Sequence, residues 1–268
     1  MKTLLDKLTD LEILNLGLEF RKSEPFNHLI IDNFLNDEDA RSIANEFPSF
    51  DDDFWYSYDN PLEIKKASND WNKFGPNTYK YFTHILSKEF SEKLNLLISD
   101  NSIIKLIPDI GLHGGGYHTH KNGGRLNPHL DYSIHPKLLM QRKVNIILYV
   151  NPHWKTEFGG DLGFWSDLNG QPDKLVKETG CVFNRAVIFD TSQNSWHGIS
   201  KEINSFNELT RNSLATYYLV QPPENTDQRM KVKYAPRDDQ KGNMEIQDLI
   251  NKRQSINEFN LVYKTNKH

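Results

Sequence analysis

The sequence of 268 residues contains a single cysteine, Cys181. One cysteine cannot form an internal disulfide, and without a second one the chain lacks the thiol pair of a structural zinc site. A small disulfide-stabilised scaffold is therefore excluded. The scarcity of cysteine favours a reducing compartment, which we expect to be the cytoplasm.

Long apolar runs are missing as well. The mean hydropathy is −0.67, and no stretch approaches the roughly 20 apolar residues that cross a bilayer. Near the start of the chain, Asp6, Asp10 and Glu12 interrupt the leucines, so the apolar centre of a signal peptide is not formed. We expect neither a membrane segment nor a membrane partner.

An excess of positive charge is also absent. The chain has 32 Lys and Arg against 36 Asp and Glu, for a formal net charge of −4, which repels a phosphate backbone at long range. The glycines at 114–116 and 123–124 lack the spacing of a P-loop or a dinucleotide-binding fingerprint. The sequence thus favours neither a nucleic-acid partner nor nucleotide binding through one of these two motifs.

The first hundred residues have mainly helical periodicity. We expect a short strand at His28–Ile31, a helix that begins after Asn36, a loop over residues 47–61 and a helical region over residues 78–100. Six leucines near the start recur at spacings of mostly three and four, which predicts the buried stripe of an amphipathic helix: Leu4, Leu5, Leu8, Leu11, Leu14 and Leu18.

From residue 103 the pattern changes to short β-branched runs separated by Gly, Pro and Asn, which is typical of an antiparallel sandwich or barrel. The predicted strands are Ile103–Ile107, Gly124–Leu126, Lys143–Val150, Asp161–Trp165, Lys174–Val176, Cys181–Phe183, Ala186–Asp190, Trp196–Ile199 and Asn212–Val220. The tail after residue 220 is polar, with helical segments at 246–250 and 256–263, and either covers a sheet edge or serves an interface. We expect one domain, with a helical layer (1–100), a β core (103–220) and this tail (221–268).

The sharpest group of chemically active residues is His129, Asp131 and the distant His197. On a strand, residues two apart project to the same side, so His129 and Asp131 can reach one metal ion. Two histidines and one carboxylate occupy one face of an octahedral ferrous ion and leave the other positions open. This pattern predicts an iron site.

The segments around these residues resemble a known family. RKVNIILYVNP, FGGDLGFW, GCVFNRAVIFD, SWHGIS and RNSLATYYL follow the predicted His-x-Asp motif in that order. This succession resembles the Fe(II)- and 2-oxoglutarate-dependent oxygenases, and within them the prolyl 4-hydroxylase-like branch. The resemblance covers roughly residues 103–220 and implies a mainly β fold with flanking helices, a double-stranded β-helix or jelly roll.

The resemblance implies a role for particular residues. It assigns His129, Asp131 and His197 to Fe(II), and Arg211 and Tyr149 to the far carboxylate of 2-oxoglutarate, where a planar guanidinium forms a paired, charge-assisted contact. Two further groups of residues are expected nearby: Ser213, on the same strand face as Arg211, and Tyr117, His118 and His120 at the substrate mouth.

Two of these assignments have alternatives in the sequence itself. Arg211 also fits a surface ion pair with Glu202 or Glu208, and Tyr149 also fits an aromatic side chain on a half-buried strand. Arg211 follows His197 after a longer gap than prolyl hydroxylases usually show, which the loop KEINSFNEL accounts for.

The resemblance implies hydroxylation of a C–H bond with molecular oxygen and release of succinate and CO2. Asp131 favours hydroxylation over chlorination, because related halogenases have a small residue at that position. The expected substrate is a prolyl group or an amino acid, either peptidyl or a small molecule, and ascorbate is a candidate additional cofactor. Two alternatives stay open: a non-catalytic jelly roll that binds a metal or a carboxylate, and the same chemistry on a sugar or another small molecule. The oligomeric state is left open.

Overall fold

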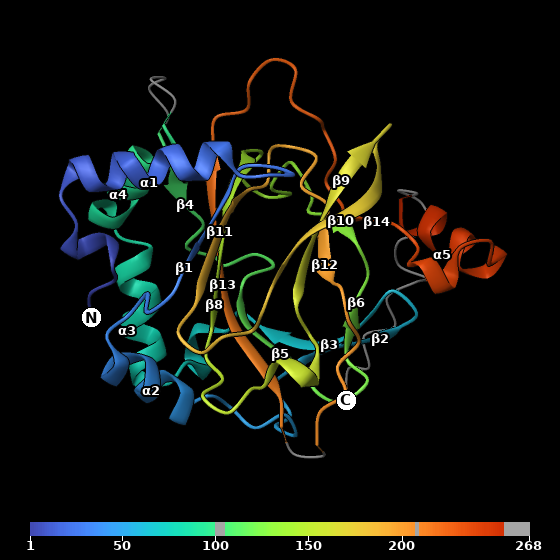
Figure 1. The fold of residues 1–268 in the computed structure, drawn as a ribbon, viewed down its shortest axis with the longest axis horizontal. Coiled ribbons are helices and arrows are strands. Elements are labelled where there is room, and N and C mark those ends of the chain that lie inside the picture. Colours follow the sequence, from blue (N-terminus) through green and yellow to red (C-terminus); the bar gives the residue numbers. More distant parts are fainter. Residues whose placement is uncertain (100–104, 207–208, 255–268) are drawn as a thin grey trace.

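The computed structural model describes residues 1–99, 105–206 and 209–254. Two antiparallel sheets face each other at its centre, and most of the helices cover the outer face of the larger sheet (Figure 1). This is the jelly roll with flanking helices that the sequence predicts. Within the described residues, no helix has both the length and the apolar character needed to span a bilayer.

The larger sheet carries the central buried strands of the molecule. Its strands, in spatial order, are β1 (His28–Ile31), β11 (Ala186–Asp190), β8 (Gln141–Tyr149), β13 (Arg211–Val220), β5 (Gly116–His120), β3 (Glu63–Ser68) and β2 (Tyr56–Asn60), with β4 (Ile107–Pro108) beside β13 and β6 (Arg125–Leu126) beside β3. All five residues of β11 are buried, as expected for a strand with a core on both faces.

The smaller sheet is shorter and lies opposite. Its order is β10 (Gln171–Thr179), β9 (Leu162–Leu168), β12 (His197–Ile199), β7 (His129–Leu130) and β14 (Lys233–Tyr234). The strand β7 has only two residues and lies between β12 and β14. The tail therefore covers the free edge of β7, which is one of its two predicted roles.

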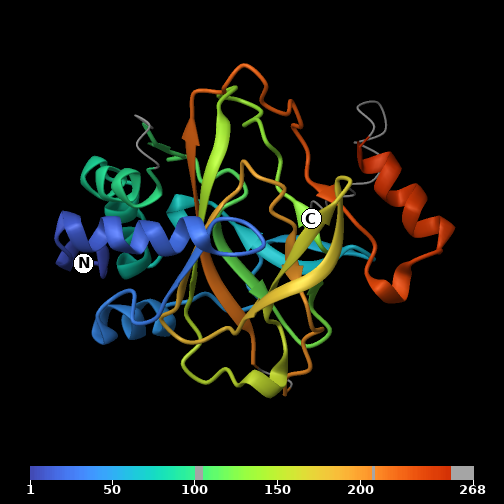
Figure 2. The same cartoon turned by 45° about the horizontal axis from the view of Figure 1, so that its top comes forward.

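Four α-helices pack beside the larger sheet, and a fifth lies on the opposite side of the molecule (Figure 2). They are α1 (Asp10–Lys22), α2 (Asp37–Asn45), α3 (Pro76–Ile85), α4 (Lys88–Ile98) and α5 (Met244–Gln254), with 3-10 turns η1 (Leu5–Lys7), η2 (Trp71–Lys73), η3 (Thr156–Phe158) and η4 (Asp238–Gln240). The apolar sides of the first four helices and the outward-facing residues of β8, β11 and β13 form the largest core.

The buried stripe predicted for the first helix is wrong. Leu11, Leu14 and Leu18 are 69%, 39% and 49% exposed, whereas Ile13 and Phe20 are buried. The helix begins at Asp10, after a capping box between Thr9 and Glu12, so the earlier leucines are not part of it and cannot set its phase. The predicted helical region over 78–100 forms two helices, because Ser87 caps a new one.

Several strand predictions also need correction. Residues 181–183 form no strand, since the chain turns there through Asn184 at a φ of 59°. Part of the predicted loop at 47–61 forms the strand β2, which is completed by pairing with β3. The strands β3, β5, β7 and β14 are absent from the predicted strands. Residues 103–104 and 256–263 lie outside the described residues.

Candidate functional site

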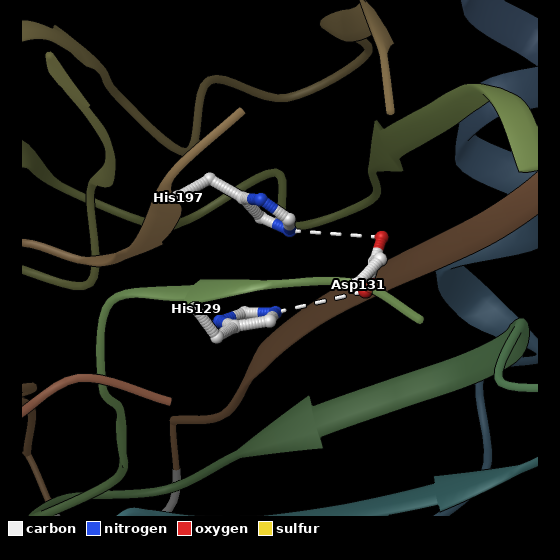
Figure 3. Close-up of side chains that lie close together, drawn as sticks. All are labelled: His129, Asp131 and His197. Carbon is white, nitrogen blue, oxygen red and sulfur yellow. Dashed lines mark ion pairs between the residues drawn. The ribbon is translucent and has the colours of Figure 1, made fainter. Parts of the chain in front are cut away.

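The three predicted metal ligands lie together between the two sheets (Figure 3). His129 is on β7, Asp131 directly follows that strand, and β12 pairs His197 with His129. The Nε2 atom of His129 is 3.8 Å from Oδ1 of Asp131, and Nε2 of His197 is 3.9 Å from Oδ2. One ligand atom from each residue lies within 4.8 Å of the other two.

Backbone contacts set the orientation of both histidine rings. Nδ1 of His129 is 2.9 Å from the carbonyl oxygen of Asn127, and Nδ1 of His197 is 2.8 Å from that of Ser195. A ring that donates through Nδ1 presents the lone pair of Nε2. Both Nε2 atoms therefore face Asp131, whose buried Oδ2 has no hydrogen-bond partner. These donors fit a divalent cation such as Fe(II).

The electrostatics of the group favour the metal-binding protonation states. Burial lowers the pKa of His129 to about 3, and the charge of His197 acts in the same direction. Burial also lowers the pKa of His197. Burial alone would raise the pKa of Asp131, but neighbouring charges, first those of His197 and Arg142, hold it below its ordinary value. Neutral imidazoles and an ionised carboxylate are the forms that bind metal.

Arg211 lies at the start of β13 and is only 4% exposed. Its Nη2 donates to the Tyr149 hydroxyl at 3.1 Å, and its Nε donates to the Gly160 carbonyl at 2.7 Å and to the Cys181 sulfur at 3.0 Å. Among the described residues, no carboxylate lies within 4.0 Å of its nitrogens. A buried guanidinium without an anionic partner is costly, so this position points to an anionic ligand.

The strand register places the other predicted residues beside Arg211. His120 pairs with Arg211, and Ser213 pairs with His118 on one side and with Tyr149 on the other. Directly paired residues project from the same face of a sheet, so all five lie on the face that looks toward the smaller sheet. His120 is 2% exposed, and neither of its ring nitrogens has a hydrogen-bond partner.

The expectation that Tyr117 lines the substrate mouth is wrong. Tyr117 is fully buried on the opposite face of β5, and its ring packs against Phe47, Trp55 and Phe74 under the helical layer. The reason is the two-residue period of a strand, which sends Tyr117 away from His118 and His120.

The alternative that pairs Arg211 with Glu202 at the surface is also overturned. Arg211 is buried, and no ion pair joins it to Glu202. Glu208 lies outside the described residues. Tyr149 is fully buried and in hydrogen-bond contact with Arg211, so it is more than an aromatic side chain on a half-buried strand.

Two arginines near the metal ligands were not singled out in the sequence. Arg142 lies 3.8 Å from the Asp131 carboxylate, and Arg229 donates to the Asp131 carbonyl. An arginine at the start of an otherwise apolar strand, as in RKVNIILY, is a usable signal for Arg142. Arg229 lies in a charged tail, where nothing distinguishes it from its neighbours.

Comparison with known proteins finds similarity over the core of the chain. The model of the 2OG-Fe(II) oxygenase superfamily matches residues 115–219, a segment that contains His129, Asp131, His197 and Arg211. Prolyl 3-hydroxylase OGFOD1 of Mus musculus is 27% identical over 209 residues, which cover 75% of this chain and 34% of that protein. The Xenopus laevis protein of the same name is 26% identical over 225 residues, covering 81% of this chain and 40% of that protein. The chain thus spans between a third and two fifths of the length of these relatives.

Two solved structures share the fold. A Pseudomonas putida prolyl-4-hydroxylase superposes with a TM-score of 0.53 at 15% identity, covering 79% of this chain and 100% of that one. A Trichoplax adhaerens prolyl hydroxylase, in complex with a peptide fragment of the hypoxia inducible factor oxygen degradation domain, gives 0.54 at 17% identity, covering 80% and 91%.

The jelly roll and the His-Asp-His group agree with the match of residues 115–219 to the 2OG-Fe(II) oxygenase superfamily. Similarity to prolyl hydroxylases in both sequence and fold agrees with the resemblance to the prolyl 4-hydroxylase-like branch found in the sequence.

Proposed function

We propose that this protein hydroxylates a C–H bond of a prolyl residue or an amino acid, using Fe(II), 2-oxoglutarate and molecular oxygen. Bound Fe(II) and 2-oxoglutarate together supply the oxidation, and succinate and CO2 are released. One observation carries the proposal: between its sheets the fold holds both a His-Asp-His group and a buried Arg211 that has no carboxylate partner among the described residues.

The residues of the chain have separate tasks in this proposal. His129, Asp131 and His197 hold the metal from one side. Arg211 and Tyr149 bind the far carboxylate of 2-oxoglutarate through N–H and O–H donors. Both side chains are buried, which keeps water away from this contact.

We also assign His120 to the residues that bind the co-substrate, together with Arg211 and Tyr149. It pairs with Arg211 across the ladder, and its two ring nitrogens are buried without partners. Because burial first, and then the charge of Arg211, lowers the pKa of His120 well below its ordinary value, its ring is neutral and has one donor and one acceptor. The N–H group of such a ring donates to an oxygen of the co-substrate when it is bound.

A prolyl residue in a peptide is the substrate that the comparisons support best. The two curated relatives are named prolyl 3-hydroxylases, and the Trichoplax structure holds a peptide. A non-catalytic binding module requires either a metal site or a carboxylate site. The presence of both on facing sheets favours an enzyme.

The test is to measure succinate formed from 2-oxoglutarate by the aerobic, Fe(II)-loaded protein, with a library of proline-containing peptides monitored for the gain of one oxygen atom. We expect succinate from the wild type, none above background from His129→Ala, and wild-type amounts from Arg185→Lys, whose arginine forms a surface pair with Asp32. A wild type that forms no succinate would contradict the proposal.

A further inference from the structure

Asp131 is the metal ligand that the sheet itself does not hold. The ladder pairs on β7 end at His129 and Leu130, and Asp131 lies just beyond them. A carboxylate outside a strand keeps its position only through other contacts. Two arginines that are far apart in the sequence, Arg142 and Arg229, make such contacts on the side-chain and main-chain sides of Asp131.

Arg142 approaches the carboxylate. Its guanidinium lies between the rings of Tyr132 and Tyr217, 3.4 Å from each centroid, and donates to the Tyr132 hydroxyl and to the His113 carbonyl. Its Nη1 is 3.8 Å from Oδ1 of Asp131. Arg142 is 1% exposed, and within the described part of the chain Asp131 supplies the only carboxylate within 4.0 Å of it. A buried cation thus faces Oδ1, whereas Oδ2 has no hydrogen-bond partner.

Arg229 approaches the same residue from the tail. Its Nε and Nη2 both donate to the carbonyl oxygen of Asp131, at 3.1 and 2.8 Å. Its own carbonyl accepts from the backbone N–H groups of Ser133 and Ile134, at 2.7 and 3.0 Å. The main chain after β7 is therefore held at three points by one residue, whose side chain is 15% exposed and also pairs with Asp227.

The tail segment that carries Arg229 lies beyond the segment matched by the family, which ends at residue 219. The same tail forms β14, which pairs Tyr234 with His129. The two rings lie 5.4 Å apart at an angle of 33°. The tail therefore contacts two of the three ligands and does more than cover a sheet edge.

We propose that Arg142 and Arg229 are positioning residues for Asp131: Arg142 orients the carboxylate so that Oδ2 faces the metal, and Arg229 fixes the main chain that carries it. This inference rests on the proposed function, because it requires a metal at the His-Asp-His group. Groups that hold metal ligands in place typically contribute about 10- to 100-fold to metal affinity.

The test is a titration of the whole chain with Mn(II) alone, in which electron paramagnetic resonance measures the free ion. The variants are Arg229→Gln, Arg229→Lys and Arg142→Lys, with His129→Ala as the baseline for loss of the site. Arg237→Gln is the matched control, since Arg237 lies in the same tail and pairs with Asp239 at 2.9 Å. Circular dichroism of each metal-free variant reports whether it is folded at the titration temperature.

We expect Arg229→Gln to weaken Mn(II) binding about 10- to 100-fold while the metal-free protein stays folded. We expect Arg229→Lys to recover part of the loss, because the ammonium keeps a donor for the Asp131 carbonyl, and Arg237→Gln to bind as the wild type does. If Arg142→Lys does not fold, the two variants Arg229→Gln and Arg229→Lys decide the result.

Equal Mn(II) affinity in the wild type and in folded Arg229→Gln would overturn the positioning role and leave the proposed function standing. An affinity loss that only follows a loss of folded protein would overturn it as well. A wild type that binds Mn(II) no better than His129→Ala would overturn the proposed function itself.

Discussion

The guanidinium of Arg211 donates to the Tyr149 hydroxyl at 3.1 Å, across the neighbouring strands β13 and β8. Its Nε donates to the Gly160 carbonyl and to the Cys181 sulfur, whereas Nη1 has no hydrogen-bond partner among the described residues. Arg211 is thus fixed at one end and has donors left at the other. This is the arrangement that a carboxylate ligand requires.

Removal of the Tyr149 hydroxyl should weaken 2-oxoglutarate binding. A hydrogen bond to a charged group contributes about 1.5–3 kcal/mol, so we expect Tyr149→Phe to raise the dissociation constant at least about tenfold, and Arg211→Lys to raise it further because the paired contact is lost. Calorimetric titration of the Mn(II)-loaded protein measures this. The control is Arg41→Lys at an exposed pair with Asp37, and unchanged affinity in both Tyr149→Phe and Arg211→Lys would contradict the assignment.

A methyl group at Gly160 should displace the Arg211 side chain and so disturb the binding of 2-oxoglutarate. Gly160 has a φ of +76°, and an added Cβ would lie 2.9 Å from Cδ of Arg211. Gly123 has the same φ with nothing within 4 Å of its Cβ position, so Gly123→Ala carries the backbone strain alone. We expect both variants to lose stability, and only Gly160→Ala to lose 2-oxoglutarate affinity as well. Equal affinity in the two variants would show that the contact with Arg211 has no effect.

The metal-free protein should lose stability as the pH falls from 6.5 to 5. Burial, as the first cause, lowers the pKa values of His118 and His129 to about 3 and lowers that of His197. The unfolded state therefore binds protons first below about 6.5, which favours unfolding by at most about 1.4 kcal/mol per pH unit for each such histidine.

Urea unfolding in the presence of a chelator measures this dependence. The variant His118→Gln should have a shallower slope than the wild type, because one histidine that is neutral in the folded protein is removed. A free energy of unfolding that stays constant between pH 6.5 and 5 would mean that these rings are not buried in the neutral form.

The corrected face of α1 makes a stability prediction. Ile13 is fully buried, and Leu11 is 69% exposed. We expect Ile13→Ala to cost about 2–5 kcal/mol through lost burial and the cavity that remains, and Leu11→Ala to change stability by about 0.5 kcal/mol or less. Chemical denaturation compares the two. A larger loss of stability for Leu11→Ala than for Ile13→Ala would mean that the predicted leucine stripe packs on the core.

The metal-binding group was predictable because its residue types carry the chemistry. His129 and Asp131 are two positions apart, and the paired strands β7 and β12 bring His197 beside them. The strand β11 was predicted with its full bounds at Ala186–Asp190, since a continuous apolar run between turn residues leaves few alternatives.

Other features depend on contacts that no local pattern encodes. The strand β7 has two residues and exists because β12 and β14 pair with it. The role of Arg229 is set by the path of the tail, which brings it to Asp131 from 98 residues away. At residues 181–183 a β-branched, aromatic sequence is overridden by the turn at Asn184, and the Cys181 thiol instead contacts Gly160 and Arg211.

The most direct test of the account is an anaerobic titration of the Fe(II)-loaded protein with 2-oxoglutarate, followed by visible absorption. We expect a weak charge-transfer band from the chelated keto acid in the wild type. We expect no band in His129→Ala, and in Arg211→Lys a band that needs more 2-oxoglutarate to develop. A wild type that binds Fe(II) and develops no band at any 2-oxoglutarate concentration would contradict the central claim that His129, Asp131, His197 and Arg211 form one oxygenase site.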